Sequence, residues 1–318
     1  MEIYLASPRG FCAGVVLAID LVEIALEKYG APVYVKHQIV HNPVVVSEVE
    51  SKGAITVENV SDVPDNSVVV FSAHGSPPSD YKLAEEKNLR VIDATCPLVT
   101  KVHNEAKKYS KEGKNIILVG HKGHQEVIGT SGQANMKIID DRDEFNLENN
   151  DSVKDEDVIV LSQTTLSVRD TENTVNKIKD VFPKAKIRND ICYATTNRQE
   201  VTVKLASEVD LILVVGASNS SNCNRLRDVS IQSGTNAYLI NSYDEIEKKW
   251  LEGIEKVGIT SGASTPDKLV YEIVKKLEPK KVIRFHDIDE EIKFEILPHN
   301  NVQSTHVICV DITILRIS

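Results

Sequence analysis

The stretch LRVIDATCP at residues 89–97 combines an apolar segment of strand character with Cys96 and an immediately following proline. Proline is favoured in the first turn of a helix, where its missing N–H group leaves no hydrogen bond unmade. The stretch therefore predicts a strand, a loop that carries the cysteine, and a helix that ends near Gly113.

Two more cysteines stand in the same setting. Cys12 and Cys192 follow short apolar segments at residues 3–5 and 185–187, and a helical pattern comes after each cysteine. The three cysteines are spaced at similar intervals along the chain. This spacing indicates a threefold internal repeat, a feature that decides the fold when it is present.

The helices after Cys12 and Cys192 have recognisable boundaries. Residues 15–29 place apolar side chains at helical spacing and stop before Gly30, as expected of a glycine just beyond a helix C-terminus. The pattern Thr196-x-x-Gln199 matches a capping box, and we expect it to open the third helix.

Each predicted helix is followed by a strand and a polar loop. The strands are expected at residues 33–35, 116–119 and 211–215. The loops carry His41, His124 and Ser220, which lie 29, 28 and 28 residues beyond their cysteines. A second strand with a polar loop then recurs in each repeat, around His74, Thr164 and Ser264.

Strands that alternate with helices predict βαβ units and small parallel sheets. The loops after parallel strands share one edge of the sheet, so three such units can direct all the polar loops to one cavity. We therefore expect an α/β fold of three pseudo-threefold-related domains, in which the N-terminal strand completes the third. The expected segments are 14–96 for the first domain, 97–191 for the second, 1–13 with 192–281 for the third, and 282–318 for a C-terminal segment that has a short strand near residue 292 and an unassigned tail.

Composition narrows the class of partners. The 318-residue chain has a formal net charge of −10, whereas general nucleic-acid and anionic-membrane binders need basic surfaces. We found no apolar run long enough for a membrane helix and no signal peptide. We therefore expect no nucleic-acid or membrane partner and a cytoplasmic location, with an organelle stroma or lumen as the alternative.

The chain has five cysteines, and an odd number disfavours a disulfide framework. Any one of them alone fits a buried structural thiol, but three at equivalent positions of a repeat suit a metal centre. A structural zinc ion would need a fourth ligand. A cubane cluster is held by thiolates, and three of them would leave one iron open to substrate. Cys223 and Cys309 fall outside the repeat, so we expect neither to be a ligand.

The loop residues form a set of hydrogen-bond donors with few formal charges. Imidazoles, hydroxyls, amides and helix N-termini together suit a diphosphate group. Glu126 is the only acid in these loops, and in a buried anion site its raised pKa would make it a proton source rather than a solvated carboxylate. His121 and His124 also have the spacing of half a zinc site, which we regard as the weaker interpretation.

Taken together, several motifs resemble those of the 4-hydroxy-3-methylbut-2-enyl diphosphate reductase family of the non-mevalonate isoprenoid pathway. The resemblance runs from residue 1 to about residue 297 and rests on PRGFCAGV, FSAHG, DATCPLVTKVH, VGHKGHQEV, SQTTLS, ICYATTNRQ, NSSNCNRL and TSGAS. The chain departs from the family after about residue 298, where no counterpart is evident, and at Cys223, where the family often has serine.

The resemblance implies three α/β domains around a central iron–sulfur cluster, a [4Fe-4S] cluster with one iron not ligated by protein. It implies cluster ligands at Cys12, Cys96 and Cys192. It implies catalytic roles for Glu126, His124 and Thr164. It implies substrate binding by His41, His74, His124, Thr164, Ser220, Ser221, Asn222 and Ser264.

The implied reaction removes the allylic hydroxyl of the substrate with two electrons and two protons, giving isopentenyl and dimethylallyl diphosphates. The sequence has no dinucleotide fingerprint or P-loop, so we expect electrons from another protein, with ferredoxin or flavodoxin implied by the resemblance. The main alternative is a cluster-dependent hydro-lyase acting on a small anionic substrate without net reduction. A nonenzymatic iron–sulfur sensor is a further alternative, disfavoured by the many anion-binding donors.

Overall fold

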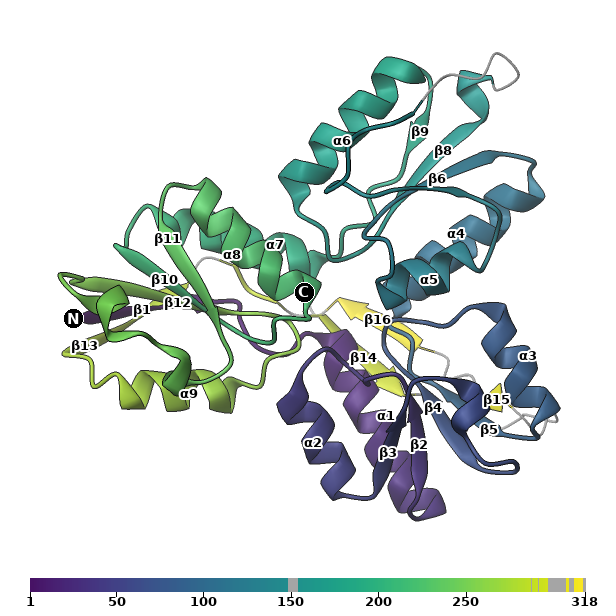
Figure 1. The fold of residues 1–318 in the computed structure, drawn as a ribbon, viewed down its shortest axis with the longest axis horizontal. Helices are drawn as coiled ribbons and strands as arrows, with labels where there is room; N and C mark the ends of the chain where they lie inside the picture. The colour runs from purple at the N-terminus through teal and green to yellow at the C-terminus, as the bar shows by residue number, and fades with distance from the viewer. Residues whose placement is uncertain (148–153, 287, 291, 297–306, 309–311, 317–318) are drawn as a thin grey trace.

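The computed structural model describes residues 1–147, 154–286, 288–290, 292–296, 307–308 and 312–316. Three α/β lobes surround a common centre, and each lobe contains its own parallel sheet (Figure 1). The expected fold class, three α/β units with small parallel sheets, is confirmed. Within the described part of the chain, no helix is both long enough and apolar enough to cross a membrane.

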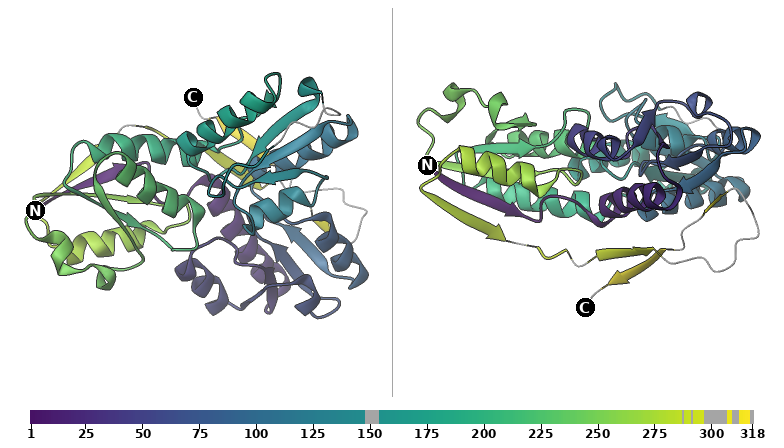
Figure 2. Two further views of the ribbon diagram at one scale, coloured as in Figure 1. Left: turned by 45° about the horizontal axis from the view of Figure 1, so that its top comes forward. Right: turned by 90° about the horizontal axis from the view of Figure 1, so that it is seen from below.

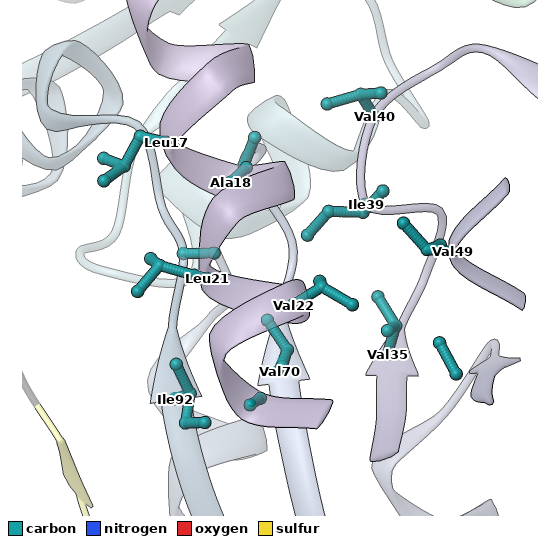
Figure 3. Packing of buried hydrophobic residues seen from close by; sticks show 14 of the residues in the cluster. Leu17, Ala18, Leu21, Val22, Val35, Ile39, Val40, Val49, Val70 and Ile92 are labelled. Atoms are coloured by element: carbon teal, nitrogen blue, oxygen red, sulfur yellow. The ribbon is translucent and has the colours of Figure 1, made fainter. Parts of the chain in front are cut away.

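The first lobe, purple to blue in Figure 1, has a sheet of order β15-β5-β4-β2-β3. Its strands are β2 (Val33–Lys36), β3 (Ala54–Val57), β4 (Val68–Phe71), β5 (Arg90–Asp93) and β15 (Val307–Ile308), and its helices are α1 (Ala13–Tyr29), α2 (Pro43–Ser51) and α3 (Pro78–Glu86). Along α1, Leu21 and Val22 point toward Val70 and Ile92 of the sheet (Figure 3). This buried face of α1 holds the helix, and thus the loop before it, in place.

The second lobe, teal in Figure 1, has a four-stranded sheet of order β7-β6-β8-β9. Its strands are β6 (Asn115–Val119), β7 (Lys137–Ile139), β8 (Val158–Ser162) and β9 (Lys186–Ile187), and its helices are α4 (Pro97–Lys111), α5 (Gln125–Ser131) and α6 (Val168–Val181). Every residue of the central strand β8 is buried, as expected for a parallel strand covered on both faces.

The third lobe, largely green, has a sheet of order β11-β10-β12-β1-β13. Its strands are β1 (Glu2–Ser7), β10 (Leu211–Val215), β11 (Asn236–Ile240), β12 (Lys256–Ser261) and β13 (Lys281–His286), and its helices are α7 (Tyr193–Ala206), α8 (Ser221–Gln232) and α9 (Asp267–Lys276). The N-terminal strand β1 joins this sheet, as expected. Strand β13 pairs with β1, so the sheet continues past residue 281 to His286.

Short 3₁₀ turns connect some of these elements. They are η1 (Val60–Asp62), η2 (Asp155–Asp157), η3 (Tyr243–Glu245) and η4 (Lys248–Leu251).

The C-terminal segment crosses from the third lobe to the first. Its strand β14 (Ile292–Ile296) is the one expected near residue 292, and it pairs antiparallel with β16 (Ile312–Arg316). In the right-hand view of Figure 2 these two strands lie beneath the layer that contains α1. Phe294 and Ile296 pack against the hydrophobic core of the first lobe. The C-terminal segment therefore adds apolar contacts to the first lobe.

The capping-box interpretation of Thr196 was wrong. Cys192 is the N-cap of α7, and the backbone N–H of Thr196 already donates to the Cys192 carbonyl at 3.0 Å. Cys12 and Cys96 are likewise the N-caps of α1 and α4. The repeat, rather than the local capping pattern, decides where the third helix begins.

Helix α7 packs on the third sheet through Leu205, which is fully buried, and Gly258 of β12 leaves room for the leucine, because a Cβ atom there would lie 2.9 Å from Leu205 Cδ2. We predict that Leu205→Ala lowers the free energy of unfolding by about 2–5 kcal/mol, because the methyl groups leave a cavity that the neighbours fill only partly. Urea denaturation followed by circular dichroism measures this change. The matched control is Val203→Ala on the exposed side of the same helix, which should change stability by about 0.5 kcal/mol or less.

Candidate active site

One cavity of about 110 Å³ lies where the three lobes meet. It is lined by residues from the loops at the carboxyl ends of strands and from the starts of helices. Every candidate residue from the sequence lines it: Cys12, Cys96, Cys192, His41, His74, His124, Glu126, Thr164, Ser220, Ser221, Asn222 and Ser264. The structure therefore brings together side chains that are far apart in the sequence.

The three cysteines are held by the same backbone contact. The N–H groups of Cys12, Cys96 and Cys192 donate to carbonyls of the loops that carry Ser264, His74 and Thr164. The acceptors are Ala263 at 3.1 Å, Ala73 at 3.0 Å and Thr164 at 3.0 Å. Each bond joins one lobe to the start of the next, so the cysteines mark the three points at which the chain passes between lobes before its C-terminal segment returns to the first.

The three thiols are free, and all three cysteines are partly buried. Burial and the neighbouring Cys12 together raise the pKa of Cys192 to about 11, although Thr195 opposes the increase with a hydrogen-bonding contact of 3.2 Å to the sulfur. Burial and Cys12 also raise the pKa of Cys96 strongly. Thiolates at these positions therefore need a nearby positive charge, such as a bound metal would supply.

The donor set fits a cubane cluster better than a single metal ion. Ligand sulfurs around one zinc ion lie about 4 Å apart, because each Zn–S bond is about 2.3 Å. Among the described residues, the group of three candidate ligand atoms within 4.8 Å of one another consists of His121, Asp140 and Asp141, not of the cysteines. A cubane spreads its thiolates over separate irons and so accepts a wider spacing.

The weaker interpretation, a half zinc site formed by His121 and His124, is not supported by the position of His121. Its Nε2 atom lies 3.0 Å from Asp141 Oδ1 and 2.9 Å from a guanidinium nitrogen of Arg225. These contacts place His121 in a network between the second and third lobes, outside the lining of the central cavity.

Three imidazoles face one another in the cavity. The ring centroids of His41 lie 4.0 Å from His74 and 5.2 Å from His124. Within the described structure, both ring nitrogens of His41 and Nε2 of His124 are buried without a hydrogen-bond partner. Buried polar atoms are nearly always paired in proteins, so these nitrogens are available to a ligand.

The histidines are neutral in the free protein. Burial, helped by neighbouring histidines, lowers the pKa of His41 to about 4 and that of His124 to about 3. Burial likewise lowers the pKa of His74 well below its usual range. A bound anion would favour the protonated forms of His41 and His74.

His37 is a neighbour of this group that the sequence reasoning missed. Its ring centroid lies 5.6 Å from His41 and 6.0 Å from His74, and its Nδ1 atom lies 3.0 Å from Glu58 Oε2. It directly follows β2 at a strand end, and this position was the signal that could have identified it.

Glu126 lies in the first turn of α5, behind the N-cap His124. Its carboxylate is buried and accepts hydrogen bonds from the backbone N–H of Thr164 at 2.5 Å and from the Thr164 hydroxyl at 3.1 Å. Burial raises the pKa of Glu126 to about 7, although the two bonds from Thr164 oppose the increase. This pKa lies close to neutrality, so the buried side chain can hold a proton at neutral pH.

The third lobe contributes the start of α8. Ser220 is its N-cap, and Ser221 and Asn222 follow in the first turn, where backbone N–H groups favour an anion. Both polar side-chain atoms of Asn222 are buried without a partner in the described structure. The Ser264 hydroxyl donates to the His41 carbonyl at 3.2 Å and joins the third lobe to the first.

Cys223 is not among the residues that line the cavity. It is fully buried in the core of the third lobe, where its sulfur lies against the backbones of Gly216 and Gly262. This environment fits a structural thiol. Cys309 lies outside the described residues.

The sequence is similar to a protein family and to several proteins that carry the name of one enzyme. Residues 3–278 match the family model described as LytB protein. A 4-hydroxy-3-methylbut-2-enyl diphosphate reductase of Aeromonas salmonicida is 45% identical over 94% of this chain and 98% of the relative. The enzyme of the same name from Streptomyces coelicolor is 49% identical over 91% of this chain and 85% of the relative.

Solved structures agree with these matches. The E-1-hydroxy-2-methyl-but-2-enyl-4-diphosphate reductase of Plasmodium falciparum superposes with a TM-score of 0.84 at 39% identity, covering 91% of this chain and 93% of the other. A second reductase structure, described as the terminal enzyme of the non-mevalonate pathway, has a TM-score of 0.61 at 33% identity and covers 87% and 99% of the two chains. With the family model, the relatives and the fold in agreement, the chain belongs to the LytB protein family.

Proposed function

We propose that the protein is an iron–sulfur reductase that converts 4-hydroxy-3-methylbut-2-enyl diphosphate into isopentenyl and dimethylallyl diphosphates. The observation that carries this proposal is the single cavity in which three free cysteines, at equivalent helix starts, face unpartnered imidazoles and a buried acid. The names of the curated relatives support reduction rather than the hydro-lyase reaction.

Cys12, Cys96 and Cys192 would hold a [4Fe-4S] cluster with one iron free of protein ligands. When bound, the cluster supplies electrons and an open iron site to the substrate. Three separate loops bring the cysteines to the lining of the cavity. Gly14 allows this arrangement, because a Cβ atom at its position would lie 2.6 Å from the Cys96 sulfur.

The hydrogen-bond donors that line the same cavity would bind the diphosphate. A bound anion raises the pKa of His41 and His74 and so favours their protonated forms, whereas His124, whose Nδ1 atom accepts a hydrogen bond, would donate to the anion from Nε2. The hydroxyls, the Asn222 amide and the start of α8 add neutral donors, and Thr164 contributes its hydroxyl. The donor residues for this role are His41, His74, His124, Thr164, Ser220, Ser221, Asn222 and Ser264.

Glu126 would supply a proton for the departing hydroxyl. Its hydrogen bond with the Thr164 hydroxyl provides a route from the buried acid to the bound substrate. Loss of the hydroxyl as water then leaves an allylic group that takes up two electrons and a second proton. His124 supports this step by fixing the first turn of α5, where its Nδ1 atom accepts the Glu126 N–H at 3.2 Å.

We propose that a small electron-transfer protein, ferredoxin or flavodoxin, delivers the electrons. A dependence of product formation on a reductant tests this point and separates the reductase from a hydro-lyase. We also retain a cytoplasmic location, or an organelle stroma or lumen, and three domains with the boundaries expected from the sequence as parts of the proposal.

We predict that Cys12→Ser, Cys96→Ser and Cys192→Ser each lose most of the iron and sulfide that the wild-type protein holds after anaerobic reconstitution. Each change removes a thiolate for which a serine hydroxyl is a poor substitute. The control is Cys223→Ala, which removes a buried thiol outside the cavity and should retain the full iron content. A complete cluster in Cys96→Ser would contradict the ligand assignment.

We predict that Glu126→Gln slows reduction by about 10²–10⁴-fold, as expected when a general acid is lost. Anaerobic single-turnover kinetics measure the rate, and calorimetry should show that the substrate still binds. Because ionisation removes the donor, the wild-type rate should decline above a pH of about 7. A nearly normal rate in the variant would exclude Glu126 as the donor, whereas lost binding would indicate a structural role.

We predict that inorganic diphosphate binds with net proton uptake at pH 7. The pKa of His41 is about 4 in the free protein, so a pKa increase on anion binding draws protons from the buffer and strengthens binding as pH falls. Calorimetry of the anaerobic, reconstituted protein in buffers of different ionisation enthalpy measures the protons. Identical enthalpies in all buffers would contradict the prediction, and His41→Phe should reduce the uptake.

A further inference from the structure

Arg198 is a fully buried charge next to two of the cysteine loops. From α7, its guanidinium donates to the Gly10 carbonyl at 2.9 Å and to the Ala194 carbonyl at 2.9 Å. Gly10 lies two residues before Cys12, and Ala194 lies two residues after Cys192. One side chain therefore fixes the backbone on the approach to one candidate ligand and just beyond another.

The Cys12 loop depends on contacts of this kind. The N–H of Gly10 donates to the Ser261 hydroxyl at 2.9 Å, and Gly10 itself has a φ of 72°, which favours glycine. With the Arg198 bond to its carbonyl, Gly10 is held on both sides. The loop reaches Cys12 in a fixed direction, so a change at Arg198 should alter the position of that sulfur.

The charge of Arg198 is partly compensated by a residue from the C-terminal segment. Its guanidinium lies 2.8 Å from Glu290 Oε1, and Asn197 donates to the same oxygen at 3.2 Å. Glu290 is beyond residue 278, where the match to the family model ends. Arginine stays protonated in proteins, so the pair places a permanent cation and an anion near the candidate cluster site.

We propose that Arg198 is a positioning residue for Cys12 and Cys192, and that the Arg198–Glu290 pair sets the reduction potential of the cluster. This inference rests on the proposed function. Reduction adds negative charge to a cluster, so a nearby buried cation favours the reduced form and a nearby anion opposes it; protein charge and outer contacts tune such potentials.

Because Arg198 and Glu290 carry opposite charges, removing each should shift the midpoint potential in opposite directions, a result that a purely structural role does not predict. Glu290→Gln leaves the cation less compensated and should raise the midpoint potential above that of the wild type. Arg198→Gln leaves the anion and should lower it. Arg198→Lys keeps the charge but loses the forked hydrogen bonds, so its potential should stay near the wild-type value while its iron content falls. General loosening of the site would shift all variants in one direction.

The measurement is an anaerobic redox titration of the reconstituted, full-length protein followed by electron paramagnetic resonance, with iron analysis of each variant. Lys114→Gln is the control, because it removes one cation of an ion pair outside the cavity and should change neither quantity. Shifts of opposite sign support the inference. Shifts of the same sign, or unchanged potentials, overturn it.

Two further outcomes keep the experiment decisive. If Arg198→Gln does not fold, Glu290→Gln still tests the sign, because it leaves the buried arginine and its backbone bonds in place. If the wild-type protein holds no reducible cluster under the same conditions, the proposed function fails at that point, before any variant is compared.

Discussion

The hydrogen bonds from the N–H groups of the three candidate ligand cysteines organise the whole molecule. Each bond connects a loop at the end of one lobe with the first residue of a helix in the next. The three connections form a closed cycle from the third lobe to the first, the first to the second, and the second to the third. The same contacts therefore fix both the relative placement of the lobes and the placement of the three sulfur atoms.

Burial then gives the cavity its chemical character. Burial lowers the pKa of imidazoles that would titrate near neutrality in water, and it raises the pKa of a carboxyl group that would otherwise be fully ionised at neutral pH. Both changes arise because the enclosed site disfavours charge. An anionic ligand has the opposite effect on His41 and His74, because it favours their protonated forms. Binding and protonation are therefore linked in a site that contains few permanent charges.

The repeat made much of this predictable from sequence, because equivalent cysteines and strand-end loops had to occupy equivalent places. All twelve candidate residues line one cavity, although their chemical roles stay proposals. Other features depend on contacts between distant parts of the chain. The pairing of β13 with β1, the ring of His37 beside His41, and the reach of Arg198 to Gly10 have no local signature. The start of α7 was mispredicted because a local capping pattern was given more weight than the repeat.

The location of the cysteines at the crossings between lobes has a consequence for folding. A group bound to all three sulfurs would cross-link points that are separated by long stretches of chain. Closing a loop of about 100 residues removes entropy worth about 4.7 kcal/mol from the unfolded ensemble in the chain-entropy description of cross-links. A metal group bound to all three sulfurs would thus cross-link the three lobes. The protein that holds this group would then resist proteolysis better than the protein that lacks it.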